Sequence, residues 1–244
     1  MNFYLDIGNS RLKSAFDSDT GLQAFEPLAW RDAGLDERLE QLWAGHKPSQ
    51  VFVCHVAEQT VLSQLERWCQ ENWQLDPQVL ATGEEFKGLR NGYQKPDMLG
   101  TDRWAAMVGA RAQLHGGALC VIDSGTATTV DLIDANGQHL GGAILPGVNS
   151  MRRALGKYTA ALFKAAGDVE PFSRDTAAGI AGGTGYASAG AIDRLIDEAI
   201  DRLGELTILF TGGEASLVAP LLRHHVIVDE MLVLSGVAAL AADS

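Results

Sequence analysis

The spacing of hydrophobic residues switches between a helical and an extended period along the chain. Apolar residues recur every three to four positions over residues 35–43, 57–73 and 101–114, which predicts amphipathic helices. Short apolar runs at residues 51–54 and 79–80 predict buried strands. Strands that alternate with helices are typical of a parallel sheet covered by helices, so the first half of the chain predicts an α/β fold.

The second half repeats this alternation, without a linker or low-complexity segment. Further strands are expected at residues 22–30 in the first half, and at residues 119–122, 128–133, 207–210 and 226–228 in the second. Further helices are expected at residues 148–155, 175–203, 214–222 and 231–242. The longest of these contains glycines, which soluble helices rarely tolerate unless another backbone packs close by. These glycines are Gly179, Gly182, Gly183, Gly185 and Gly190.

Two segments, residues 3–17 and 121–131, share one layout. Each has an apolar strand, an aspartate, one residue, a glycine, small polar residues and a second extended pattern. The two aspartates, Asp6 and Asp123, are separated by about half of the chain, which indicates that a whole domain is duplicated. The sequence therefore predicts two domains, at residues 1–115 and 116–244.

The repeated hairpin favours phosphate binding. A glycine beside the acid lets backbone N–H groups approach an anion, and hydroxyls of Thr126, Thr128 and Thr129 are expected to line the second turn. Asp123 is placed to hold a Mg²⁺ that travels with the phosphates, and Lys13 supplies positive charge in the first hairpin. A single Asp-x-Gly turn is more often only a turn, but its repetition favours a nucleotide. The glycine turn at residues 211–213 supports the same site.

A polar, turn-rich segment at residues 88–97 interrupts the regular pattern and contains Tyr93. Loops of this kind often carry function. The helix that follows is expected to have Thr101 as its N-cap. Asp102 is then either a favourable charge on the helix dipole or a general base, with Arg103 holding an anionic substrate group.

Composition excludes several classes of partner. The chain has 244 residues, a formal net charge of −12 and a pI near 4.8, which oppose nucleic-acid binding. Cys54, Cys69 and Cys120 lie in apolar surroundings and predict buried free thiols of a reducing compartment. No histidine or cysteine cluster predicts zinc, and no signal peptide or apolar run of membrane-spanning length is apparent, so a cytoplasmic protein is expected.

Taken as a set, five motifs resemble the type III pantothenate kinase family. They lie at residues 6–13, 100–103, 123–131, 141–147 and 211–213, in the order and spacing of that family over nearly the whole chain. The resemblance implies two ribonuclease H-like domains of the actin-like, sugar kinase and Hsp70-like fold, with ATP in an interdomain cleft. It also implies phosphorylation of pantothenate to 4'-phosphopantothenate, the first step of coenzyme A biosynthesis, by a homodimer that requires Mg²⁺ and either K⁺ or NH₄⁺.

The resemblance also implies roles for individual residues. Asp102 matches the proton acceptor, Asp6 the Mg²⁺-side carboxylate, and Asp123 the position of the monovalent cation. Thr126 matches a phosphate-binding residue of the second hairpin, and Thr176 a residue that reaches the substrate from the neighbouring subunit. The first phosphate loop would comprise Asp6, Ile7, Gly8, Asn9, Ser10, Arg11, Leu12 and Lys13. Ser10 stands where the family often has a threonine, a change that keeps the hydroxyl. The pantothenate pocket would comprise Tyr93, Gly100, Thr101, Asp102 and Arg103.

Two other functions remain open for this sequence. A non-catalytic ATP-binding regulator, chaperone or filament of the same fold would keep both hairpins but would not need Tyr93, Asp102 and Arg103 together. A kinase for a sugar or another small alcohol would share the phosphate loops, but it generally has a longer chain and different substrate loops. The presence of all three residues favours pantothenate.

Overall fold

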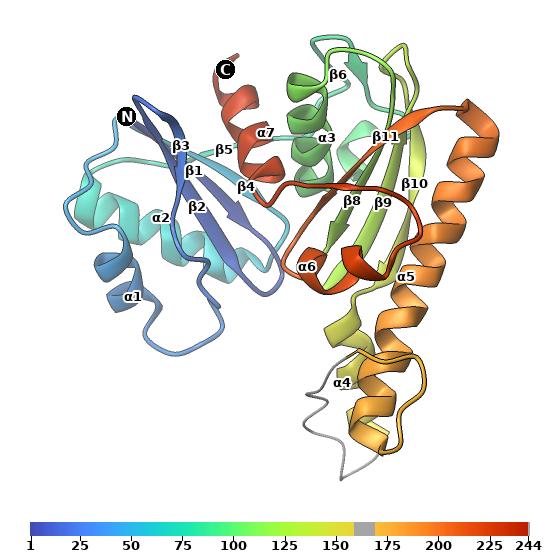
Figure 1. Cartoon of the computed structure of the whole chain (residues 1–244). Helices are drawn as coiled ribbons and strands as arrows, with labels where there is room; N and C mark the ends of the chain where they lie inside the picture. The colour runs from blue at the N-terminus through green and yellow to red at the C-terminus, as the bar shows by residue number, and fades with distance from the viewer. Residues whose placement is uncertain (159–168, 244) are drawn as a thin grey trace. The chain divides into compact units, whose positions relative to one another are not determined.

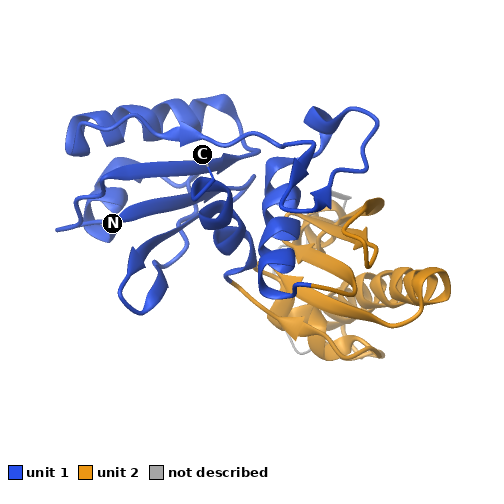
Figure 2. Cartoon of the chain, turned by 90° about the horizontal axis from the view of Figure 1, so that it is seen from above, with its two compact units in different colours: residues 1–115, 231–244 blue, residues 116–230 orange. Residues whose placement is uncertain are grey.

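The computed structural model describes residues 1–158 and 169–243, which form two compact units (Figures 1 and 2). Unit 1 comprises Met1–His115 and Met231–Ser244, and unit 2 comprises Gly116–Glu230. The chain divides between residues 115 and 116, and unit 2 ends at Glu230 because the C-terminal helix packs against elements of unit 1.

Unit 1 is built on a five-stranded sheet with the order β3-β2-β1-β4-β5. The strands are β1 (Asn2–Ile7), β2 (Leu12–Ser18), β3 (Gly21–Ala24), β4 (Gln50–His55) and β5 (Gln78–Val79). The first three are antiparallel neighbours, whereas β4 and β5 run parallel to β1. The strand expected at residues 22–30 is shorter than predicted. After Ala24 the chain contacts β2 through a hydrogen bond from the Phe25 N–H to the Ser14 carbonyl oxygen and through a bridge between Leu12 and Leu28.

Helices cover both faces of this sheet. The helices α1 (Leu35–Leu42) and α2 (Gln59–Trp73) bury the face that carries Phe3, Leu5 and Ile7. Successive residues of a strand point to opposite faces, so Tyr4 and Asp6 point to the other one. The helices α3 (Thr101–Gln113) and α7 (Leu232–Ala241) contact the strands of this sheet and pack against each other.

The crossing of α3 and α7 depends on two glycines. A Cβ atom at Gly236 would lie 1.8 Å from the carbonyl oxygen of Ala105, and one at Gly109 would lie 2.3 Å from the carbonyl oxygen of Leu232. Real Cβ atoms do not approach backbone this closely, so the two helices touch through their main chains. Any larger residue at either position has to force the helices apart.

We therefore expect Gly236→Ala to destabilise the protein by ~1–3 kcal/mol, because the new methyl group overlaps a backbone carbonyl that cannot rotate away. Gly190→Ala is the matched control, since it lies in a helix with no atom within 4 Å of the new Cβ. That control should stabilise the protein by ~0.5–1 kcal/mol through helix propensity. Urea denaturation followed by circular dichroism measures both changes, and equal effects at the two positions would contradict the packing argument.

The segment that precedes α3 is more ordered than a plain loop. It contains a short hairpin of β6 (Glu85–Phe86) and β7 (Leu89–Arg90), followed by the 3-10 helix η1 (Pro96–Met98). Lys87 and Gly88 form the hairpin turn with φ angles of 46° and 87°. The prediction of a turn-rich segment is therefore confirmed, and part of this segment forms regular secondary structure.

Unit 2 repeats the sheet of unit 1. Its order is β10-β9-β8-β11-β12, with antiparallel pairing of β8, β9 and β10 and parallel pairing of β8, β11 and β12. The strands are β8 (Ala118–Ser124), β9 (Ala127–Ile133), β10 (His139–Pro146), β11 (Leu206–Thr211) and β12 (Ile227–Val228). Order and direction match those of unit 1 strand for strand, which confirms the internal duplication.

The helices of unit 2 differ in part from those expected. They are α4 (Val148–Tyr158), α5 (Thr176–Leu203), α6 (Ala215–Val218) and the 3-10 helix η2 (Ala219–Leu221). The helix expected over residues 214–222 is shorter than predicted, since Pro220 cannot continue an α-helix. The packing predicted for the glycines of α5 is correct at Gly182, where a Cβ would lie 1.9 Å from the carbonyl oxygen of Glu170. At Gly179, Gly183 and Gly190, no atom of the described residues of this chain lies within 4 Å of an added Cβ, so nothing within the described part of the chain packs there.

The three cysteines are buried free thiols, as predicted. Burial raises the pKa of the Cys69 and Cys120 thiols to about 12, so both are protonated at neutral pH. These cysteines therefore act as small apolar core residues rather than as nucleophiles. No helix in the described part of the chain is long and apolar enough to cross a membrane.

Candidate functional site

In unit 1 the acid of the first hairpin lies in a row across three strands. Asp6, which is only 7% exposed, is the penultimate residue of β1. Its cross-strand neighbours are Lys13 on β2 and Cys54 on β4. Directly opposed residues of adjacent strands point to the same face, so a cation, a carboxylate and a thiol lie side by side.

The turn of this hairpin is closed by its own backbone. The N–H of Gly8 donates to the carbonyl oxygen of Arg11 at 3.0 Å, which leaves Asn9 and Ser10 at the tip. Ile7 and Leu12, which belong to the predicted phosphate loop, are fully buried on the face covered by α1 and α2. Their side chains therefore serve the core, and only their backbone groups are suited to contact a phosphate.

The N-terminus of α3 lies beside the end of β4. The sequence predicts Thr101 as the N-cap of α3, but the N-cap is Gly100, and no side chain forms a capping hydrogen bond at this helix end. The Thr101 hydroxyl instead donates to the carbonyl oxygen of His55 at 3.1 Å, and the Cys54 thiol donates to that hydroxyl at 3.3 Å. Because Cys54 is the strand neighbour of Asp6, these bonds bring the helix start next to the row that contains Asp6.

Asp102 turns its carboxylate back over the start of the helix. Its Oδ1 atom accepts the backbone N–H of Arg103 at 2.7 Å. A Cβ atom at Gly100 would lie 2.6 Å from the same oxygen, so a larger residue there would displace the carboxylate from this position. The unsatisfied N–H groups of a helix N-terminus favour a negative charge, which suits an ionised carboxylate.

Arg103 and Tyr93 form a part-buried pair beside this carboxylate. The guanidinium Nη1 donates to the Tyr93 hydroxyl at 2.6 Å, and the guanidinium carbon lies 5.3 Å from the centroid of the tyrosine ring. Arg103 is only 6% exposed, which is rare for an arginine without a structural or binding role. The structure thus brings together the substrate residues that the sequence predicts on unit 1.

Asn91 holds the segment that carries Tyr93, and sequence reasoning missed this role. Its side-chain oxygen accepts the Tyr93 N–H at 3.0 Å. Its side-chain nitrogen donates to the carbonyl oxygens of Gly83 and Pro96, each at 3.1 Å. The Asn-Gly pair at residues 91 and 92 indicates a turn in the sequence, but only the fold shows which backbone groups it joins.

In unit 2 the corresponding row consists of oxygen donors. Asp123 on β8 lies between Thr129 on β9 and Thr211 on β11. The Thr211 hydroxyl is buried and has no hydrogen-bond partner among the described residues. A Cβ at Gly212 would lie only 2.3 Å from Asp123 Oδ1. A carboxylate with neighbouring hydroxyls is the chemistry of a hard cation site, and the donors present here fit that use.

The threonines of the second turn have different environments. Thr126 is exposed at the tip, and its carbonyl oxygen accepts the N–H of Gly147 at 3.1 Å and the hydroxyl of Ser150 at 2.7 Å. Thr128 does not line the turn, contrary to the expectation from the sequence. It is fully buried and shares a 2.8 Å hydrogen bond with the hydroxyl of Ser124, since it points to the core face of the strand.

Glu214 joins the second hairpin to α4, and the sequence analysis did not single it out. Its carboxylate accepts the N–H groups of Val148 at 2.7 Å and Asn149 at 2.9 Å, so it fills the N-terminus of α4. The hydroxyl of Ser124 lies 3.5 Å from the same carboxylate. An acid directly after the Gly-Gly turn was the available signal, but its partners are far away in the sequence.

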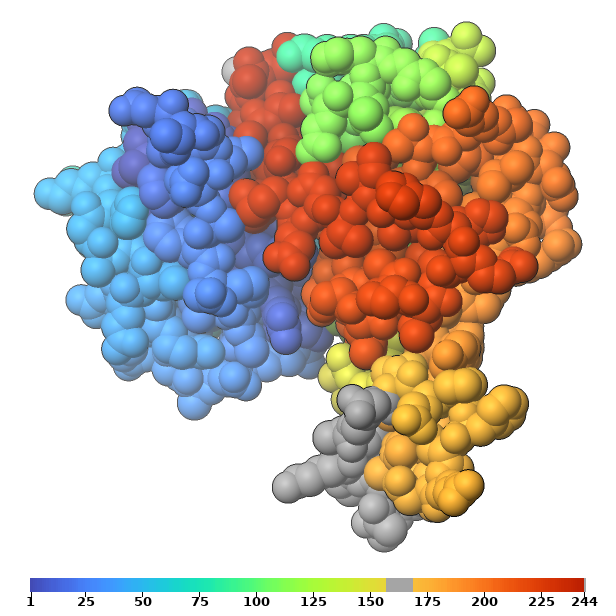
Figure 3. Space-filling view, in the orientation of Figure 1, coloured from blue at the N-terminus to red at the C-terminus, as the bar shows by residue number. Residues whose placement is uncertain are grey.

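The remaining site residues are separated between the units. Thr176 is the first residue of α5 in unit 2 and is exposed. Figure 3 shows the surface of α5 in yellow-orange to orange. Asp6 and the pantothenate-pocket residues belong to unit 1, whereas Asp123 and Thr126 belong to unit 2. In residues 1–158 and 169–243, no group of three or more His, Cys, Asp or Glu side chains is arranged to hold a metal ion.

Comparison with known proteins identifies the family. The family model described as type III pantothenate kinase matches residues 2–198. The chain belongs to the type III pantothenate kinase family. A member from Nitrosococcus oceani is 38% identical over 253 residues, which cover 100% of this chain and 95% of that relative. A member from Azoarcus is 39% identical over 245 residues, covering 99% of this chain and 91% of the relative.

Solved structures agree with the fold expected of this family. A protein described as a Baf family transcriptional activator from Campylobacter jejuni has a TM-score of 0.61 and 25% identity, covering 99% of this chain and 98% of that one. A ROK family glucokinase from Streptomyces griseus, with glucose and AMPPNP, has a TM-score of 0.56 and 12% identity, covering 100% and 99%. The type III pantothenate kinase chain thus has the actin-like, sugar kinase and Hsp70-like fold.

Proposed function

We infer that this protein transfers the γ-phosphoryl group of ATP to pantothenate, which yields 4'-phosphopantothenate in the first step of coenzyme A biosynthesis. Membership of the type III pantothenate kinase family supports the reaction. The structural observation that supports this reaction is the grouping of Asp102, Arg103 and Tyr93 at the start of α3. An ATP-binding regulator has no need for a carboxylate, a buried arginine and a phenol in this arrangement.

Asp102 is the proposed general base. Its carboxylate lies at a helix N-terminus, which favours the ionised form, and the Arg103 N–H fixes one of its oxygens. The attacking hydroxyl of pantothenate gives its proton to this carboxylate as the oxygen bonds to phosphorus. Gly100 leaves space for the Asp102 carboxylate, and Thr101 attaches the start of α3 to β4 through its hydrogen bond to His55.

Arg103 is proposed to hold the carboxylate of pantothenate, because a guanidinium offers several donors to an anion. Tyr93 positions this guanidinium through the 2.6 Å bond and flanks the substrate chain. The phosphates of ATP are proposed to contact residues 6–13 in unit 1 and Thr126 in unit 2. In the first hairpin, Asn9, Ser10 and Arg11 contribute backbone groups, Gly8 closes the turn, and Lys13 contributes charge.

Asp6 and Asp123 are proposed to hold the cations. Mg²⁺ is usually bound by one or two carboxylates together with substrate phosphates, so Asp6 suffices as its protein ligand. Asp123, with the hydroxyls of Thr129 and Thr211 beside it, is proposed to hold K⁺ or NH₄⁺. When bound, such cations neutralise negative charge that develops on the transferring phosphoryl group.

A homodimer is proposed, with Thr176 of each subunit reaching the pantothenate site of the other. Thr176 is exposed at the start of a helix whose nearby Gly179 and Gly183 leave space for a neighbour. Analytical ultracentrifugation at assay concentrations tests this assembly. A fully active monomer would exclude a role for Thr176 across an interface.

The decisive experiment incubates the purified protein with ATP, MgCl₂ and KCl and a panel of acceptor alcohols that includes pantothenate and several sugars. We expect phosphate transfer to pantothenate alone, with loss of activity when K⁺ and NH₄⁺ are both omitted. Turnover of a sugar would favour the other kinase function. Binding of ATP without transfer to any acceptor would favour a regulator.

A further inference from the structure

The carbonyl groups of the first hairpin turn are held by a segment outside the hairpin. The indole Nε1 of Trp30 donates to the carbonyl oxygen of Gly8 at 2.8 Å. The guanidinium Nε of Arg31 donates to the carbonyl oxygen of Asn9 at 3.3 Å. Two consecutive carbonyl groups at the tip of the turn therefore face the same pair of side chains.

Peptide planarity determines where the N–H groups of the same bonds point. In a trans peptide the N–H lies opposite to the C=O, and the described residues contain no cis peptide bond. The N–H groups of Asn9 and Ser10 therefore point away from Trp30 and Arg31. Successive backbone N–H groups on one side of a turn form the kind of concave donor site that binds phosphate oxygens.

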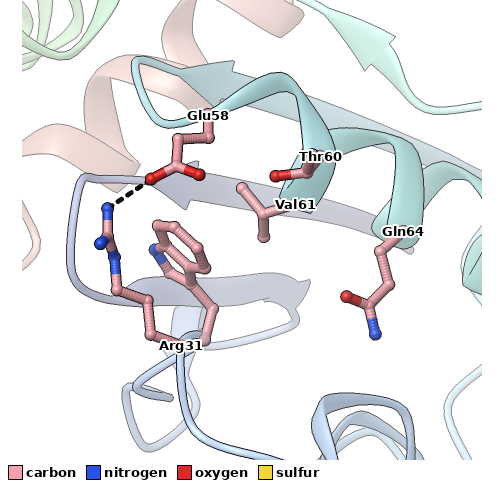
Figure 4. Close-up of a pocket in the computed structure, with 6 residues that line it drawn as sticks. Arg31, Glu58, Thr60, Val61 and Gln64 are labelled. Carbon is pink, nitrogen blue, oxygen red and sulfur yellow. Dashed lines mark hydrogen bonds and ion pairs between the residues drawn. The ribbon is translucent and has the colours of Figure 1, made fainter.

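Further contacts fix the two side chains that hold the turn. Arg31 Nη2 lies 2.8 Å from Glu58 Oε1, as the dashed line in Figure 4 shows, and the guanidinium carbon lies 4.6 Å from the centroid of the Trp30 ring. Just before them, Leu28 and Leu12 exchange two backbone hydrogen bonds of 2.8 and 2.9 Å, which attach this segment to β2. The side chains of Arg31 and Glu58 are more than half exposed, so their ion pair contributes little energy on its own.

These residues also line a surface pocket of about 400 Å³ behind the turn. The lining residues are Trp30, Arg31, Glu58, Thr60, Val61 and Gln64. Figure 4 shows Glu58, Thr60, Val61 and Gln64 on the helical side of this pocket, with Arg31 facing Glu58. The pocket lets water reach the Arg31 bond, whereas the bond from Trp30 to Gly8 is partly buried and is the stronger contact.

We propose that Trp30, assisted by Arg31, is a positioning residue of the ATP site, which holds the Gly8 and Asn9 carbonyls so that the Asn9 and Ser10 N–H groups face the phosphates. The proposal rests on the proposed kinase function, because it assumes that this hairpin binds ATP. It extends that function to residues outside the phosphate loop. Neither residue touches the reacting atoms in this role.

The test is Trp30→Phe, which keeps an aromatic ring but removes the indole N–H. We expect the Kd for ATP, measured by calorimetry without pantothenate, and the KM for ATP each to rise about three- to tenfold, as the loss of one hydrogen bond predicts. The KM for pantothenate should not change. Arg31→Met should give a smaller increase, because its bond is longer and more exposed.

Trp68→Phe and Arg67→Met are the matched controls. The Trp68 indole donates to the carbonyl oxygen of Asp36 at 3.2 Å, in the same unit and equally part-buried, while Arg67 forms a similarly exposed ion pair with Asp36. Both controls should leave ATP binding unchanged. An unchanged Kd for ATP in Trp30→Phe, or an equal increase in Trp68→Phe, would overturn the proposal.

Two further outcomes are distinguishable. If Trp30→Phe fails to fold, Arg31→Met tests the same hydrogen-bonded turn at an exposed position, and an unchanged Kd for ATP in that variant would overturn the proposal. If the wild-type protein binds ATP but phosphorylates no pantothenate, the proposed function fails while the calorimetric comparison still decides the role of Trp30. If the wild-type protein does not bind ATP, both proposals fail.

Discussion

Asp102→Asn should lower kcat for pantothenate phosphorylation by about 10²–10⁴-fold while the Kd for ATP stays close to that of the wild type. Asparagine keeps the size of the side chain, and its oxygen can still accept the Arg103 N–H that Asp102 accepts at 2.7 Å. It cannot take the proton of the attacking hydroxyl. Because phosphoryl transfer depends mainly on positioning and electrostatics, some activity should remain.

Asp97→Asn provides the matched control for this prediction. Asp97 lies five residues earlier in the same segment, at the start of η1, and is exposed. It should retain full activity. If Asp102→Asn turned over within about threefold of the wild-type rate while Asp102→Ala unfolded, Asp102 would be a charge that stabilises the start of α3 and not a base.

Asp123→Asn should reduce turnover by about 10²-fold or more at saturating Mg²⁺ and K⁺, because a neutral side chain no longer compensates a bound cation. The fold should be retained, because asparagine has nearly the same shape as aspartate and fits the space beside Gly212. That space is narrow, since a Cβ added at Gly212 would lie 2.3 Å from Asp123 Oδ1. The measurement is kcat as a function of K⁺ concentration, with folding checked by circular dichroism. Near-normal activity would show that Asp123 only ends its strand.

Two companion variants separate the cation role from a general loss of charge. Asp201→Asn removes an exposed carboxylate from α5 in the same unit and should have no effect. Thr211→Val removes the buried hydroxyl beside Asp123 and keeps the side-chain shape. It should raise the K⁺ concentration needed for half-maximal activity, with a smaller loss of kcat than Asp123→Asn.

The repeated architecture could be predicted from the sequence because it depends on local patterns. The Asp-x-Gly turns at Asp6 and Asp123 predict two equivalent hairpins, and the apolar runs around them predict the strands. Both sheets then follow with one topology. The Gly100–Arg103 motif placed Asp102 correctly on the first turn of α3 because helix periodicity begins there.

The missed features depend on contacts between distant parts of the chain. Trp30 reads as a core aromatic in the sequence, and nothing local to it indicates a bond to Gly8. Glu214 fills the N-terminus of α4, which begins more than sixty residues earlier in the chain. Thr101 was expected to cap its helix, but the nearby carbonyl of His55 on β4 is its actual partner. Local propensity cannot anticipate such partners, because the fold supplies them.

The return of α7 to unit 1 has a consequence for how the protein is made. The helix α7 follows Gly116–Glu230 in the chain, yet it contacts β1 and β4, which precede that segment. The face of these strands on which the rings of Tyr4 and Phe52 stack is therefore completed only after Gly116–Glu230 has been synthesised, and this unit can fold before unit 1 is complete. A nonsense mutation that removes Leu232–Ala241 would consequently damage unit 1, although most of that unit is far away in sequence from the missing codons.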